Sequence, residues 1–70
     1  MMNWREVKLD ERAIRKFFAY TGLTAPPYSL TPPARKMTGG ELQEWLKRKK
    51  VSWSYSDEVM RNAISLSIRR

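Results

Sequence analysis

All four prolines of this 70-residue chain lie between positions 26 and 33, as the pairs Pro26-Pro27 and Pro32-Pro33. Proline fixes φ, lacks an amide donor and pushes the residue before it toward extended geometry. No long helix can therefore cross this stretch. The sequence predicts a proline-rich connector over residues 24–37, with one helix-forming region before it and another after it.

The connector also carries residues that favour a docked arm over a free linker. Tyr28 and Leu30 are apolar enough to pack back on the core. Thr31 before Pro32 allows one short helical turn that reaches Met37, because proline is favoured in the first turn of a helix. We therefore expect an ordered connector that contains such a turn.

The region 10–23 has the signals of a helix with both ends marked. Asp10 is typical of an N-cap. Gly22 is typical of a C-cap, where only glycine adopts positive φ readily. Between them an apolar stripe recurs at three- and four-residue spacing: Ile14, Phe17, Phe18 and Thr21. We predict a helix near residues 11–21.

The rest of the chain, residues 38–70, reads as a helix, an extended segment and a second helix. Thr38-Gly39-Gly40-Glu41 has the spacing of a capping box, in which threonine and glutamate satisfy each other's backbone amides. This box predicts a helix near residues 40–50. Residues 51–56 alternate apolar and small polar side chains, which indicates a strand or an extended loop. Helical spacing then returns near residues 57–68.

These elements predict one mainly α domain over residues 1–70, a small three-helix fold with a proline-rich arm. The chain has no cysteine, so neither disulfides nor thiolate metal sites stabilise it. Its core must come from aromatic and aliphatic side chains. The alternative is an α+β fold, in which a short two-stranded element joins Trp4–Leu9 with Val51–Tyr55.

The acidic residues offer little for catalysis. The chain has neither histidine nor cysteine, and these are the commonest general base, thiol nucleophile and zinc ligands. Six of the seven acids fall in predicted first turns of helices: Asp10, Glu11, Glu41, Glu44, Asp57 and Glu58. Helix dipoles favour negative charge there. We therefore expect a protein that is not an enzyme and that uses no cofactor and no metal.

Gly39-Gly40 follows Arg35 and Lys36 at a predicted helix start. Backbone amides at such a position can cradle a phosphate. Glu41 in the same turn would repel that anion, and the capping box already accounts for these residues. A tight cap is therefore favoured over a phosphate cradle.

Positive charge is the feature that points to a partner. Fourteen Lys and Arg against seven Asp and Glu give a formal net charge of +7, which favours a polyanionic ligand. The densest run is Lys47-Arg48-Lys49-Lys50 at the end of a predicted helix, where the helix dipole alone also favours cations. Other cations are spread over the chain: Arg12, Arg15, Lys16, Arg35, Lys36, Arg61, Arg69 and Arg70.

The leading interpretation is a small basic DNA-binding accessory or regulatory protein of the phage or mobile-element type. It would contact the phosphate backbone through the end of the second helix, and RNA is not excluded. The predicted contact residues are Lys47, Arg48, Lys49, Lys50, Arg35, Lys36 and Arg61. No apolar run has the length of a signal peptide or a membrane span. We therefore expect a cytoplasmic protein with no membrane partner, either monomeric or a homodimer.

The alternative is a small interaction or inhibitor protein that covers an acidic or regulatory surface of a larger protein. Aromatic residues beside positive charges dominate many protein interfaces. The predicted partner contacts are Trp53, Tyr28 and Trp4. Trp53 is also placed to stack on unpaired bases, although its alternating neighbours favour packing in the core.

The segment from Met37 to Ile68 resembles the SAP family, a helix, extended loop and helix module that binds DNA. The resemblance lies in apolar spacing: Leu42, Leu46 and Val51, followed by Met60 and Ile64. Lys50 and Tyr55 stand where that family tends to have glycine. The resemblance implies two packed helices and a DNA partner for this part of the chain.

Overall fold

Three helices and a very small antiparallel sheet make up the computed structural model, which describes residues 3–50 and 56–69. The helices are α1 (Glu11–Thr21), α2 (Gly39–Arg48) and α3 (Asp57–Ser67). A 3-10 turn, η1 (Trp4–Glu6), precedes strand β1 (Lys8–Leu9), which pairs with β2 (Met37–Thr38). The mainly α fold with three helices is confirmed. Among the described residues, no helix has the length and apolar character to cross a bilayer.

The predicted helix ends are set by side-chain caps. Asp10 accepts a hydrogen bond from the Ala13 amide at 2.8 Å, and Gly22 closes α1 with a positive φ of 71°. Thr38 and Glu41 form the complete capping box at the start of α2. Ser56 caps α3 by accepting from the Val59 amide at 3.3 Å. Because these caps are local in sequence, both termini of α1 and the starts of α2 and α3 were predictable.

The second helix ends earlier than predicted. α2 stops at Arg48, and Lys49 is its C-cap, with an amide that donates to the carbonyls of Trp45 and Leu46. Lys50 then adopts a positive φ of 53°. The last two residues of the basic run therefore leave the helix.

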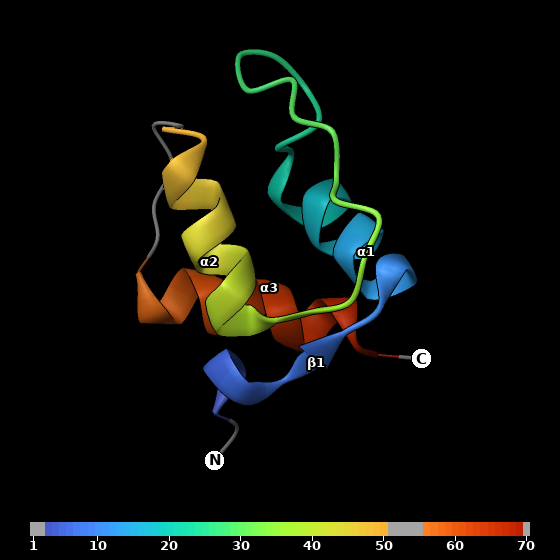
Figure 1. Cartoon of the computed structure of the whole chain (residues 1–70), viewed down its shortest axis with the longest axis vertical. Helices are drawn as coiled ribbons and strands as arrows, with labels where there is room; N and C mark the ends of the chain where they lie inside the picture. Colours follow the sequence, from blue (N-terminus) through green and yellow to red (C-terminus); the bar gives the residue numbers. More distant parts are fainter. Residues whose placement is uncertain (1–2, 51–55, 70) are drawn as a thin grey trace.

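The connector runs back past α1 and docks on the domain, as predicted (Figure 1). Half-buried Tyr28 and Leu30 pack against the core, and the Leu30 amide donates to the Leu23 carbonyl at 2.9 Å. The predicted helical turn up to Met37 is wrong. Met37 instead pairs with Leu9 in the sheet and buries its side chain, so extended geometry is stabilised there.

The two-stranded sheet pairs β1 with a strand at the end of the connector. β1 aligns Lys8 with Thr38 and Leu9 with Met37, antiparallel. Trp4–Glu6, which the alternative fold placed in a strand, forms the 3-10 turn instead, with Asn3 as its cap. The expected partner, Val51–Tyr55, lies outside the described residues.

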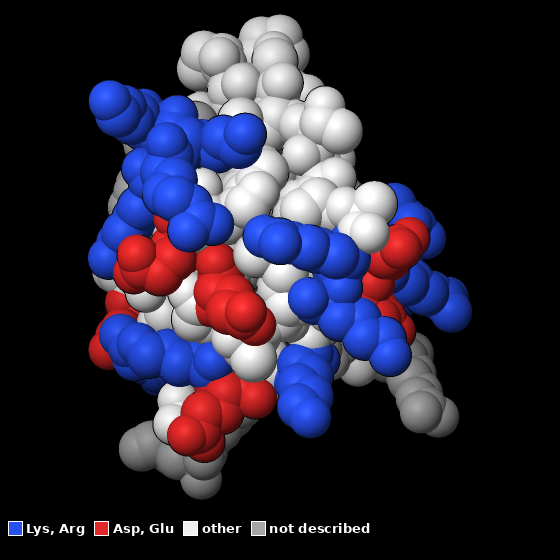
Figure 2. Space-filling view, viewed as in Figure 1, with Lys and Arg blue, Asp and Glu red and all other residues white. Residues whose placement is uncertain are grey.

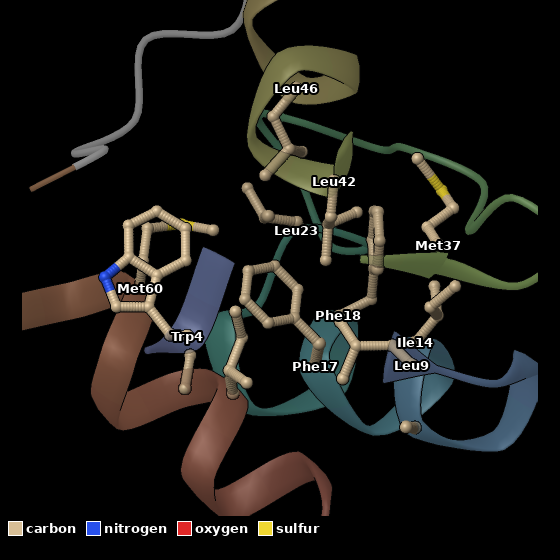
Figure 3. Packing of buried hydrophobic residues seen from close by; sticks show 13 residues of the cluster. Trp4, Leu9, Ile14, Phe17, Phe18, Leu23, Met37, Leu42, Leu46 and Met60 are labelled. Atoms are coloured by element: carbon tan, nitrogen blue, oxygen red, sulfur yellow. The ribbon is translucent and has the colours of Figure 1, made fainter. Parts of the chain in front are cut away.

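One cluster of buried side chains joins all of these elements (Figure 3). α1 and α3 share the most extensive helix contact, and α2 covers the rings of α1. Phe18 contacts Phe17 and Trp45 edge to face, at centroid distances of 5.9 and 5.8 Å. Among the described residues, nine large side chains are fully buried: Phe17, Phe18, Leu9, Ile14, Leu23, Leu42, Leu46, Met60 and Ile64. The two strands thus belong to the same core as the helices.

Candidate nucleic-acid interface

The basic run predicted from the sequence lies on the surface at the end of α2. Lys47, Arg48, Lys49 and Lys50 are all exposed. Arg35, far away in sequence, joins them, since Arg35 and Arg48 line one shallow hollow of about 440 Å³. We call these five residues, Arg35 and 47–50, the helix-end surface.

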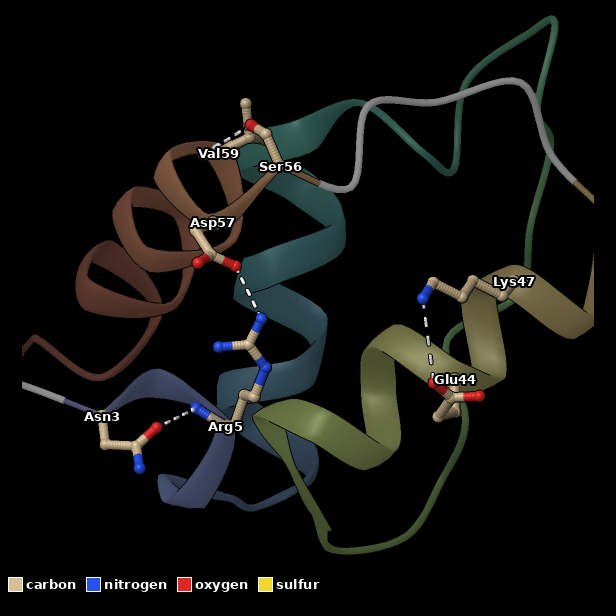
Figure 4. A network of polar contacts seen from close by, with 7 residues as sticks. All are labelled: Asn3, Arg5, Glu44, Lys47, Ser56, Asp57 and Val59. Atoms are coloured by element: carbon tan, nitrogen blue, oxygen red, sulfur yellow. Dashed lines mark hydrogen bonds and ion pairs between the residues drawn. The ribbon is translucent and has the colours of Figure 1, made fainter.

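Neighbouring groups hold this surface only loosely. Lys47 lies 3.9 Å from Glu44, but both side chains are at least half exposed (Figure 4), so the pair contributes little to stability. The Lys49 ammonium lies 5.0 Å from the centre of the Trp45 ring, which is within range of a cation–π contact. Glu41 and Glu44 line the same hollow as Arg35 and Arg48, so the helix-end surface has two carboxylates beside its five exposed cations.

Two of the predicted contact residues are not included in the helix-end surface. Arg61 is exposed on α3 and lines neither of the two hollows described here. Lys36, the neighbour of Arg35 in sequence, lines a different hollow. Of the seven predicted residues, only Arg35 and Arg48 line the same hollow.

The second hollow lies over the two-stranded sheet and has a volume of about 970 Å³. Five cations line it. They come from the strands or the residues next to them, from α1 and from the end of the chain, in that order: Lys8, Lys36, Arg12, Lys16 and Arg69. We call this site the sheet hollow. Figure 2 shows basic side chains gathered over the end of α2 and, separately, over α1 and the sheet, with acidic side chains between them.

The acids of the sheet hollow are already engaged with the backbone. Asp10 caps α1 by accepting from Ala13, and Glu41 accepts from the Thr38 amide at 2.9 Å. That amide hydrogen bond, helped by the Thr38 hydroxyl and by the charge of Arg35, lowers the pKa of Glu41 below its ordinary value of 4.5. Glu41 is therefore charged at neutral pH.

The cations of the sheet hollow have no such partners. Lys16 donates to the Arg69 carbonyl at 3.1 Å, which is a neutral acceptor. The ion pairs within the described residues are Arg5 with Asp57, Arg15 with Glu11 and Lys47 with Glu44. None of them includes a cation of the sheet hollow. Five cations therefore share the hollow with two carboxylates, and none of the five forms an ion pair within the described part of the chain.

The structure describes two of the three aromatic residues predicted as partner contacts, and neither is fully exposed. Trp4 has an exposed fraction of only 3% and belongs to the core, with the Arg5 guanidinium 4.3 Å from its ring centre. Tyr28 is half-buried against the same core. Trp53 lies outside the described residues. The prediction that Trp4 is a surface contact is wrong, because η1 folds its ring inward.

Gly39-Gly40 is a cap and a close contact rather than an open phosphate cradle. A Cβ at Gly39 would lie 2.0 Å from the Trp4 carbonyl oxygen and 2.8 Å from Ile64. The Gly39 amide donates to the Val7 carbonyl at 3.0 Å. The backbone around η1 therefore covers this helix start, and glycine is needed for the close approach.

Sequence reasoning missed Lys8 as a candidate and treated Arg12, Lys16 and Arg69 only as scattered charge. Arg12 and Lys16 are four residues apart on α1, so they share one helix face. Nothing in the sequence shows that this face meets Lys8, Lys36 and the end of α3. Only the tertiary fold assembles the sheet hollow.

Searches against known protein families, curated proteins and solved structures find no match for this chain. The resemblance of Met37–Ile68 to the SAP family therefore stays a prediction. Within residues 3–50 and 56–69, no three potential ligand side chains gather closely enough to hold a metal ion.

Proposed function

We propose that this protein binds the phosphate backbone of DNA through the helix-end surface, as an accessory or regulatory protein of the phage or mobile-element type. The supporting observation is that Arg35 and Arg48, thirteen residues apart in sequence, line the same hollow, a proximity that the fold and not helix periodicity produces. The helix dipole accounts for cations in the last turn of α2. The helix dipole does not account for Arg35, which lies in the connector and lines the same hollow as Arg48.

The chemistry of this surface suits phosphate better than bases. Its side chains are exposed, long and cationic, and such residues fix a protein on the backbone without reading sequence. Neutralising phosphates releases condensed counterions, so affinity should fall steeply as salt rises. The protein would therefore bind many sequences, with an affinity set by the number of phosphates it contacts.

The test compares two variants that remove equal charge. Arg35→Gln with Arg48→Gln removes two cations from the helix-end surface, whereas Arg15→Gln with Arg61→Gln removes two cations that line neither hollow. Titrations of duplex DNA over a range of salt give the slope of log affinity against log salt. We expect the first variant to flatten this slope by about 2 and the control by much less, since each lost contact removes about 0.9.

Two results would contradict the proposal. If the two variants changed the salt slope equally, only the net charge of the protein would matter for binding. If the wild type did not bind duplex DNA at all, DNA would not be the partner. Parallel titrations with RNA decide between the two polymers. If instead a protein partner remains bound through purification at high salt, the domain belongs to the class of small interaction or inhibitor proteins. The location of that partner would then identify the cell compartment.

A further inference from the structure

The sheet hollow has the properties of a second phosphate-contact surface. Its five cations come from separate parts of the chain, and none of them forms an ion pair within the described residues. Like charges held together in a concave site create a focused positive potential. Repulsion among these five cations does not stabilise the folded chain, so an anion is the expected ligand of the sheet hollow.

The fold holds the cations of the sheet hollow in place. The register of β1 with β2 sets Lys8 opposite Thr38. Lys16 is half-buried, and its hydrogen bond to the Arg69 carbonyl links α1 to the end of α3. A site whose backbone is fixed before binding loses less conformational freedom when a ligand arrives.

The size of the sheet hollow indicates more than one phosphate. Its volume of about 970 Å³ lies near the upper end of the range for small-molecule sites, which is roughly 300–1,000 Å³. The hollow is open to solvent over the sheet, and within the described residues its lining has no aromatic side chain on which a base would stack. A stretch of sugar–phosphate backbone fits this lining.

The two cationic surfaces adjoin each other across an acidic side chain. Both hollows are lined by Met37, Thr38 and Glu41, so Glu41 lies between them. A single strand that ran from one surface to the other would carry phosphates directly over this carboxylate. In a duplex, however, the two backbones are separated by a groove about 6 or 12 Å wide. A groove would let Glu41 lie between backbones rather than under one.

We propose that the sheet hollow contacts a second phosphate backbone, so that the protein holds both strands of one duplex, one on each cationic surface. This inference rests on the proposed binding of DNA by the helix-end surface. It adds the class of polymer, a duplex rather than a single strand, and a second set of contact residues. The longest dimension of the molecule is 32 Å, which corresponds to about nine base pairs at 3.4 Å each.

The experiment uses the full chain with a duplex of about 12 base pairs, roughly 40 Å long, and with one of its strands alone. Lys8→Gln with Lys36→Gln removes two exposed cations from the sheet hollow. The helix-end pair, Arg35→Gln with Arg48→Gln, and the control pair, Arg15→Gln with Arg61→Gln, remove the same charge elsewhere. Circular dichroism and thermal unfolding establish that each variant is folded.

On the duplex, we expect each surface pair to flatten the salt slope by about 2 and the combination of both pairs to flatten it by about 4, with the control close to wild type. On the single strand, the combined effect should be no larger than that of one pair. Amide chemical shifts of the wild type measured by NMR should move near Lys8 and Lys36 as well as near Arg48 when duplex is added. This second measurement needs no variant.

The outcomes separate the two proposals. If only the helix-end pair and its amides respond, the sheet hollow is not a contact surface, and the proposed function stands without it. If only the hollow responds, the helix-end surface is wrong and the duplex inference falls with it, because one surface cannot hold two backbones. Equal binding of single strand and duplex, with both surfaces responding to each, would overturn the two-backbone arrangement. An effect of the control as large as the others would overturn both proposals.

Discussion

The helix-end surface and the sheet hollow carry similar charge but are built in different ways. The first consists mainly of four successive residues, 47–50, at the end of one helix. The second brings together residues from Lys8 to Arg69, almost the whole length of the chain. A charge run is visible in a sequence and has an ordinary explanation in the helix dipole. An assembled constellation is invisible in the sequence and has no such explanation, so it is the stronger indication of a ligand.

The two surfaces also differ in what lies beneath them. Leu9, which lines the sheet hollow and not the other one, is completely buried in the core. At the helix end, Lys49 and Lys50 follow the last residue of α2 and are exposed. We therefore expect substitutions in the framework of the sheet hollow to lower the free energy of unfolding, and substitutions at the helix end to affect binding alone.

The largest effect is expected for Trp4→Ala, in the turn that leads into β1. Trp4 is buried, and its carbonyl approaches the backbone at Gly39 and so holds η1 against the start of α2. Removing a buried tryptophan side chain costs about 3–5 kcal/mol of unfolding free energy. Equilibrium denaturation with urea measures this loss. Trp4→Phe should lose less, because it keeps an aromatic ring in the core.

The opposite pattern would restore Trp4 as a surface contact. In that case Trp4→Ala would weaken binding to a partner while the midpoint of urea unfolding stayed at the wild-type value. The packing of η1 would then contribute little to the stability of the residues that frame the sheet hollow. The two surfaces would no longer differ in how much their substitutions affect unfolding.

Sequence reasoning predicted this molecule best where structure is set by local caps. The boundaries of α1 followed from Asp10 and Gly22, and the start of α2 from Thr38 with Glu41. It failed where a partner distant in sequence decides. Met37 is extended because it pairs with Leu9, and a strand of two residues has no periodicity to detect. The inward position of Trp4 depends on its close approach to Gly39.

The same reasoning explains how much of the candidate sites was predictable. The exposed cations 47–50 were identified because they are neighbours in sequence. Arg35 was included with them, but Lys36 was assigned to the same surface and belongs to the other. In an extended segment successive side chains point to opposite sides, and the sequence alone did not show which side each would meet.

An intermediate effect is expected for Thr38→Ala, because Thr38 borders both hollows and caps α2. Loss of a threonine N-cap typically costs about 0.5–2 kcal/mol of unfolding free energy. Thermal or urea unfolding near neutral pH measures it. Thr38→Ser keeps the hydroxyl and serves as the control, and an equal loss in both variants would mean that the methyl group, rather than the cap, is responsible.

The pH dependence of the same variant follows from Glu41. Hydrogen bonding to Thr38 lowers the pKa of Glu41 in the folded protein, so the folded state binds fewer protons there than the unfolded state. The stability linked to this group is present above the ordinary pKa of 4.5 and is lost as the pH falls through the folded value. Thr38→Ala keeps the backbone amide that donates to Glu41 and removes only the hydroxyl's contribution, so we expect a partial narrowing in acid of the difference in unfolding free energy between wild type and this variant. A difference that widens in acid would exclude the capping carboxylate as its cause.

The smallest effect on stability is expected for Lys47→Gln at the helix end. Its pair with Glu44 is long at 3.9 Å and solvent-exposed, and exposed helical pairs of this kind contribute about 0.2–0.5 kcal/mol. The unfolding midpoint should therefore hardly move, while the salt slope of duplex binding falls by about 1. Glu44→Gln is the control, because it breaks the same pair but removes a negative charge, so it should leave stability similar and strengthen binding. If both substitutions weakened binding to the same extent, the ion pair between Lys47 and Glu44 would be what positions the helix-end surface. Binding at the helix end would then depend on its structural framework, as we expect for the sheet hollow.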